Sequence, residues 1–262
     1  MIKLQIIILC KDNPSEVKFT LDSLPEDHSI LNIVYLFIDG SSTGICKSII
    51  DNECLGVFHY EYFNSFSMGI SGIYPSMNLA LSKLKSDWCI FMNSGDQFHD
   101  NFKFSLLLNL IDTTSLVQCV FGYSKIISPN GFSWYVPSPN INQIQRWCKY
   151  FEPTHQSMFV KSDLAIQYKF DELSRIGADS LWKRSIINNS NFIFLKHPVS
   201  NFFLGGISST YSFHLLKEKY SEPSRRSYEK FMEIVKYILF KLGLFSPQLQ
   251  AFRSEFFCFF FR

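Results

Sequence analysis

The chain has 262 residues, of which 47% are hydrophobic, and its 25 basic and 23 acidic residues leave a net charge of +2. This length is enough for one α/β domain with an appendage, and so even a charge balance excludes a general electrostatic attraction to nucleic acid. The seven cysteines are scattered and form no C-x-x-C pair, which argues against a disulfide framework and a structural zinc site and fits a reducing compartment.

The first hundred residues alternate between apolar runs and helical patterns. The Ile-rich run at 4–10 is typical of a strand buried on both faces of a parallel sheet. It lacks the cleavage site of a signal peptide, and no run reaches the roughly 18 apolar residues of a spanning helix, so we expect a cytoplasmic protein. Strands are predicted at 4–10, 33–38, 57–63 and 88–92, and helices at 14–24, 43–54 and 74–84. This alternation indicates a Rossmann-like, mostly parallel α/β sheet flanked by helices.

The second half of the chain has a more mixed pattern. Strands are predicted at 117–127, 157–160 and 192–195, helices at 142–150 and 178–187, and a hairpin at 129–131. From Lys217 onward the chain is both basic and apolar, with nine basic against five acidic residues. This composition fits equally a helical tail packed on the domain and a peripheral anchor on an anionic membrane.

Two predicted strands end in polar turns that contain glycine and aspartate, Asp39-Gly40-Ser41-Ser42 and Asn93-Ser94-Gly95-Asp96. Ligands of open α/β sheets bind at the carboxyl ends of strands, so the two turns predict a shared site. The Asp96 carboxylate suits a hard cation such as Mg²⁺ or Mn²⁺, and Asp39 suits a nucleobase or ribose. Taken alone, each turn is better explained as an ordinary turn or helix cap, and it is their occurrence together that favours a site.

Asp179 falls in the first turn of a predicted helix, where the helix dipole alone would stabilise it. If it faces the site it is a candidate general base, with Asp171 and Glu172 as the nearby alternatives. His155-Gln156 and Gly205-Gly206 are weak signals on their own. The sequence contains no P-loop, dinucleotide-binding, metalloprotease or serine-hydrolase fingerprint.

The order of these segments resembles family 2 glycosyltransferases of the GT-A fold, in particular those of bacterial polysaccharide and O-antigen synthesis. The resemblance spans about residues 3–208. The matching segments are the first strand with Asn13, residues 38–43, Gly72-Ile73-Tyr74 with Met77-Asn78, residues 91–96, His155-Gln156, Ala178-Asp179 and residues 205–208.

The resemblance implies a role for each matching residue. Asp179 would be the base of an inverting transfer, and Asp96 would hold Mn²⁺ or Mg²⁺. The residues expected to bind the nucleotide-sugar donor are Asp39, Ser41, Asn78, Asn93, Ser94 and Asp96. The residues expected to line the donor or acceptor pocket are His155, Gln156, Gly205 and Gly206.

The resemblance also implies an organisation and a setting. Residues 1–215 would form the GT-A domain, with a nucleotide-binding half at 1–100 and an acceptor half at 101–215, followed by a helical tail at 216–262. The donor would be a UDP-sugar and the acceptor a lipid-diphosphate-linked sugar in O-antigen synthesis, with no nucleic-acid partner. The tail would then contact the cytoplasmic face of the inner membrane peripherally.

Several positions depart from the family pattern. Gly44 directly follows Thr43 where a second Asp is common, Pro75-Ser76 replaces Asp-Ala, and residues 68–70 lack the usual acidic pair. These losses support one alternative, a non-catalytic sugar- or nucleotide-binding module, while Asp96 and Asp179 count against it. The other alternative, a nucleotidyltransferase, needs a Gly-rich basic loop after the first strand, where residues 11–14 offer one Lys and no Gly.

Overall fold

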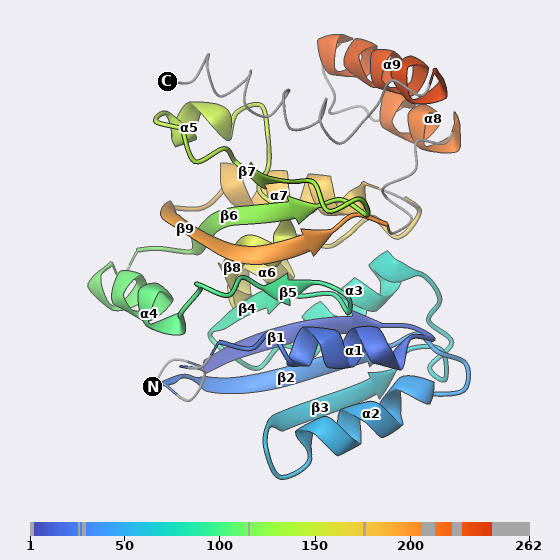
Figure 1. Cartoon of the computed structure of the whole chain (residues 1–262), viewed down its shortest axis with the longest axis vertical. Coiled ribbons are helices and arrows are strands. Elements are labelled where there is room, and N and C mark those ends of the chain that lie inside the picture. The colour runs from blue at the N-terminus through green and yellow to red at the C-terminus, as the bar shows by residue number, and fades with distance from the viewer. Residues whose placement is uncertain are drawn as a thin grey trace.

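A computed structural model describes residues 3–25, 27, 30–114, 116–174, 177–205, 213–221 and 227–242. Within these ranges one nine-stranded sheet has the order β3-β2-β1-β4-β8-β6-β9-β5, and β7 pairs with β6. Figure 1 shows this sheet running through the molecule with helices on both faces. The strands are β1 (Lys3–Cys10), β2 (Asn32–Asp39), β3 (His59–Asn64), β4 (Trp88–Phe91), β5 (Gln97–Phe98), β6 (Cys119–Ile127), β7 (Ser133–Val136), β8 (Met158–Lys161) and β9 (Phe192–Phe203).

The two halves of the sheet follow different pairing rules. In the first half β1 pairs in parallel with both β2 and β4, and β2 pairs in parallel with β3. In the second half β8 is antiparallel to both β4 and β6, while β9 is parallel to β6. Parallel neighbours need a long crossover, so the first half is built from strand–helix–strand units.

Side-chain alternation along β1 divides the core into two layers. Ile7 and Leu9 face a cluster that includes residues of α3 (Ile73–Ser82), α6 (Ser162–Gln167) and α7 (Ala178–Asn188). Ile6 and Ile8 face the opposite cluster, with residues of α1 (Pro14–Leu21), α2 (Ile45–Cys54) and α4 (Phe104–Thr113). Because successive side chains of a strand point to opposite faces, a continuous apolar run fills both layers.

The tail contains two further helices, α8 (Phe213–Ser221) and α9 (Ser227–Lys241), which contact each other. The rings of Phe213 and Tyr237 meet edge to face with centroids 6.2 Å apart. Among the helices of the described ranges, none has both the length and the apolar character needed to cross a membrane. Residues 222–226 and 243–262 of the expected tail, and the predicted site residue Gly206, lie outside the described residues.

The fold class expected from the sequence is confirmed, and several element boundaries are wrong. The strand predicted at 192–195 continues to Phe203, and the helix predicted at 142–150 is only the short α5 (Ile144–Trp147). Strand β5 and helices α4 and α6 were not predicted. The continuation of β9 carries Lys196, His197 and Pro198, which interrupt its apolar pattern, and its register against β6 is irregular at Tyr123.

Strand β6 approaches β9 closely at Gly122. A Cβ atom there would overlap the backbone oxygen of His197 and would lie 2.7 Å from Cγ2 of Val199. We expect Gly122→Ala to lower the free energy of unfolding by about 1–3 kcal/mol, the usual cost of overpacking. Urea denaturation measures this loss. Gly40→Ala is the matched control, because its Cβ would have no neighbour closer than 3.6 Å, and equal midpoints for the two variants would contradict the close approach.

Candidate active site

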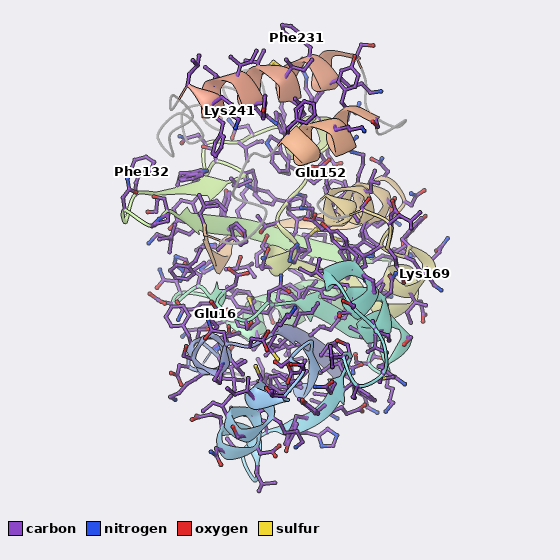
Figure 2. All side chains as sticks on the ribbon, turned by 90° about the vertical axis from the view of Figure 1, so that its right-hand side faces the viewer. Glu16, Phe132, Glu152, Lys169, Phe231 and Lys241 are labelled. Atoms are coloured by element: carbon purple, nitrogen blue, oxygen red, sulfur yellow. The ribbon has the colours of Figure 1, made fainter. Side chains whose placement is uncertain are left out.

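The pairing of β1 brings the two polar turns predicted from the sequence to one edge of the sheet. Cys10 at the end of β1 pairs with Asp39 at the end of β2. On the other side of β1, the Ser94 N–H donates to the Leu9 carbonyl over 3.0 Å. The turns therefore lie on either side of the carboxyl end of β1, and Figure 2 views the molecule from the side to which these strands point.

Asp39 is fully buried and both of its carboxylate oxygens accept hydrogen bonds within the chain. Oδ1 accepts from the backbone N–H of Ser41 over 2.8 Å and from its hydroxyl, and Oδ2 accepts from the Tyr62 hydroxyl over 2.8 Å. The Ser41 hydroxyl in turn accepts the Asp12 N–H over 2.8 Å. Asp39 thus organises the turn, and a bound base or ribose would have to share these oxygens or replace Tyr62.

Asp96 is also buried, with 6% of its surface exposed. Its Oδ2 accepts from Nε2 of Gln156 over 2.7 Å, and its Oδ1 accepts from the backbone N–H of Phe203 over 3.2 Å. Burial raises the pKa of Asp96 to about 7, against the effect of these two donors, and the charge of Glu16 raises it further. The structure therefore joins the predicted residues Asp96 and Gln156 in one contact.

A series of contacts between polar side chains connects the 93–96 turn with α7. Nδ2 of Asn93 lies 3.2 Å from Nε2 of His155, and Nδ1 of His155 lies 3.7 Å from Oδ2 of Asp179. Burial lowers the pKa of His155 even though Asp179 favours its charged form, so the imidazole is neutral at pH 7. The contacts are continuous from one side chain to the next, although the residues that make them, Asn93, His155 and Asp179, are far apart in the sequence.

Asp179 is held by groups on three elements. Nζ of Lys183 lies 3.0 Å from its Oδ2, and the Tyr74 hydroxyl donates to its Oδ1 over 3.3 Å. The same Tyr74 oxygen accepts the Gly177 N–H over 2.7 Å, which fixes the start of α7. Burial opposes ionisation of Asp179, but the Lys183 charge and the contact with His155 outweigh it and hold the pKa well below its usual value. The carboxylate is therefore ionised. The Asp179 side chain is 27% exposed.

Other predicted residues have structural partners. Asn78 donates to the Phe170 carbonyl over 2.9 Å and to Oε1 of Glu172 over 2.8 Å, so it anchors that loop. Asp171, the alternative base, accepts hydrogen bonds from its own turn, from the Leu173 N–H and the Ser174 hydroxyl. Gly205 follows β9 with a φ of 151°. Among the three acidic candidates, Asp179 is the one that contacts His155.

Sequence reasoning missed two functional candidates, Lys183 and Tyr74. Lys183 lies four residues after Asp179 in α7, and that spacing alone signals an ion pair on one helix face. Tyr74 belongs to α3, 105 residues from Asp179, and no sequence pattern announces the contact.

The effect of the Lys183 charge on the pKa of Asp179 can be tested by titration, without measuring any reaction. In Lys183→Met the pKa of Asp179 rises towards its usual value, because the largest influence that lowers it is gone. Carboxyl carbon NMR shifts measured against pH report this change. Lys85→Met, which removes a lysine 2.9 Å from Glu61 on the surface, should leave the titration of Asp179 unaltered. An Asp179 pKa that stays depressed in Lys183→Met would contradict the assignment.

Comparison with solved structures shows the same fold elsewhere. Residues 1–349 of TarS from S. aureus in complex with UDP-GlcNAc match with a TM-score of 0.60 at 13% identity, covering 90% of this chain and 72% of that chain. The complex of the same protein with UDP matches with a TM-score of 0.57 at 14% identity, covering 90% and 70%. At these identities the likeness is one of fold.

The sequence comparisons address the family directly. Curated protein sequences give no match. Residues 5–187 match the family described as glycosyl transferase family 2, which is well over half of the chain. The chain therefore belongs to glycosyl transferase family 2 and is a glycosyltransferase with a GT-A fold.

Proposed function

We propose that the chain transfers a sugar from a nucleotide-diphosphate sugar to an acceptor hydroxyl with inversion at the anomeric carbon. The observation that carries this proposal is the connection of the 93–96 turn through His155 to the ionised Asp179. A UDP-sugar is the expected donor, and the structures of TarS with UDP-GlcNAc and UDP support it, since that protein has the same fold.

The family implies a divalent metal, and the residues at the 93–96 turn fit one. Oδ1 of Asn93 is buried and has no hydrogen-bond partner, and it lies in the same turn as the Asp96 carboxylate. These are oxygen ligands, which Mg²⁺ and Mn²⁺ prefer, and such ions commonly take one or two carboxylates together with substrate phosphates. Asp96 and Asn93 would therefore hold Mn²⁺ or Mg²⁺. When bound, such an ion offsets negative charge on a departing diphosphate.

Asp179 is the proposed base. Its carboxylate accepts the proton of the acceptor hydroxyl while that oxygen forms a bond to the anomeric carbon. The bond from the anomeric carbon to the diphosphate breaks, and the nucleoside diphosphate leaves with the electron pair. Lys183 keeps Asp179 ionised and Tyr74 orients it, so the base is already unprotonated when the acceptor arrives.

The remaining site residues are proposed to position the substrates. Asp39 and Ser41 would order the nucleoside at the end of β2, which keeps the anomeric carbon aligned with the acceptor. The other proposed contacts with the donor are those of Asn78, Asn93 and Ser94. The side chains and backbone proposed to line the donor or acceptor pocket are His155, Gln156, Gly205 and Gly206.

A lipid-diphosphate-linked sugar in surface polysaccharide synthesis, of the O-antigen type, is the proposed acceptor. The exposed apolar side chains of α9 support a peripheral contact with the cytoplasmic face of the inner membrane. Phe231 is 62% exposed and Ile238 is 49% exposed, and Lys230 and Lys241 belong to the same helix. Apolar side chains beside lysines suit the boundary between acyl chains and anionic headgroups.

Two alternatives were open from the sequence, and the family match disfavours both. A nucleotidyltransferase would transfer the nucleotidyl group and release diphosphate, whereas a glycosyltransferase releases nucleoside diphosphate. A non-catalytic binding module would release neither. Two assays of the purified protein distinguish the three outcomes, one with nucleotide sugars and candidate acceptors and the other with nucleoside triphosphates and sugar 1-phosphates. Nucleoside diphosphate released in the first identifies a glycosyltransferase, diphosphate released in the second identifies a nucleotidyltransferase, and release of neither identifies a binding module.

Asp179→Asn tests the base. The variant keeps the shape of the side chain and loses its proton affinity, so transfer should fall by roughly 10²-fold or more, while the donor Kd stays nearly constant. Release of nucleoside diphosphate measures transfer, and calorimetry measures donor binding. Asp171→Asn is the matched control and should transfer normally. Normal transfer by Asp179→Asn together with loss in the control would move the role to Asp171.

The proposed metal site at Asp96 is tested separately. Chelation with EDTA should abolish transfer, and added Mn²⁺ or Mg²⁺ should restore it. Asp96→Asn, which retains the volume of the side chain, should lower transfer by about two orders of magnitude or more while the circular dichroism spectrum is preserved. Glu16→Gln, a change at the nearby exposed carboxylate, is the control. Full transfer in EDTA, or by Asp96→Asn, would reject this metal site.

A further inference from the structure

The Asp39 carboxylate lies beside two buried thiols that the proposed transfer does not use. Cys10 is the last residue of β1, and Cys46 lies in the first turn of α2. Each residue offers one ligand atom, and the two sulfurs and the Asp39 oxygen all lie within 4.8 Å of one another. In the described part of the chain this is the one group of three such residues with that proximity.

The sheet topology explains how these residues come together, although their spacing in the sequence matches no metal-binding motif. The parallel register of β1 and β2 pairs Cys10 with Asp39. The turn after Asp39 leads into α2 at Gly44. Gly44 has a φ of 63°, in the left-handed region, which a glycine adopts with little conformational strain. This entry places Cys46 in the buried face of α2, with its sulfur 3.7 Å from the Ser41 hydroxyl. Strand β1 and helix α2 thus supply two thiols that lie 36 positions apart, and strand β2 supplies the carboxylate between them.

We propose that Cys10, Asp39 and Cys46 form a binding site for a thiophilic divalent cation of the Zn²⁺ class. Zn²⁺ takes thiolate and carboxylate ligands tetrahedrally at about 2.3 Å and about 2.0–2.2 Å, so the ligand atoms of such a site lie roughly 3.5–3.8 Å apart. The distances between the three atoms therefore need to contract by no more than about 1.3 Å. The Ser41 hydroxyl or a water molecule completes the tetrahedron.

Ligand chemistry separates this site from the one proposed at Asp96. Two sulfur ligands select soft or borderline cations, whereas the oxygens of Asn93 and Asp96 suit Mg²⁺ or Mn²⁺. Binding would release the thiol protons of Cys10 and Cys46 to solvent, since the thiolate is the ligand form. Under the proposed function Asp39 also positions the nucleoside, but cation binding itself is independent of that role.

Titration of the reduced, chelator-stripped full chain with Cd²⁺ tests the proposal through the ultraviolet thiolate-to-cadmium charge-transfer band. We expect one equivalent to bind and Zn²⁺ to displace it. Cys10→Ala and Cys46→Ala should each weaken binding by at least about 100-fold, the upper end of what loss of a supporting partner costs. Cys54→Ala, at a buried cysteine at the other end of α2, is the matched control and should bind like the unaltered chain.

X-ray absorption by the Zn²⁺-loaded unaltered chain keeps the test decisive if a variant fails to fold. Two sulfur scatterers at about 2.3 Å with oxygen neighbours are the expected result. A shell without sulfur, or no stoichiometric binding, would overturn the proposal. So would a band that survives in both Cys10→Ala and Cys46→Ala, or one that disappears in Cys258→Ser, a change outside the described residues.

Discussion

Strand β1 bonds in parallel to β2 on one side and to β4 on the other, and the candidate site depends on this pairing. The register sets Cys10 beside Asp39 and Ile7 beside Phe91, so the turns after β2 and β4 open at the same edge. Strand β1 has no exposed side chain after Lys3, because both of its faces are covered. A slip of one residue would turn every side chain to the opposite layer, so burial fixes the geometry of the site.

The second half of the chain supplies the polar groups that complete this edge. Gln156 and the backbone of Phe203 hold the Asp96 carboxylate, and His155 links Asn93 to Asp179. Burial disfavours ionisation of both Asp96 and Asp179, but neighbouring charges make the outcome different at the two carboxylates. Burial raises the pKa of Asp96 to about 7, whereas the Lys183 charge overcomes it at Asp179. Environments that separate two carboxylates in this way are typical of sites that handle protons and cations.

Sequence patterns predicted the parallel half of the fold because its strands are continuous apolar runs between helical segments. They failed where packing decides the structure, as in β9, which continues past the polar residues Lys196 and His197 because β6 and β5 pair with it. The site residues at strand ends were predicted for the same reason as the strands. Contacts between distant segments, such as Tyr74 with Asp179, were missed because they depend on how α3 and α7 pack.

The stereochemistry of transfer tests the central claim most directly. A single displacement with Asp179 as base forms the new bond on the face opposite the departing diphosphate, so the anomeric configuration must invert. NMR of the product formed from a donor of defined configuration measures this through the coupling constant of the anomeric proton. Inversion, observed before any anomerisation of the product, is the predicted result. Retention of the donor configuration would contradict the mechanism.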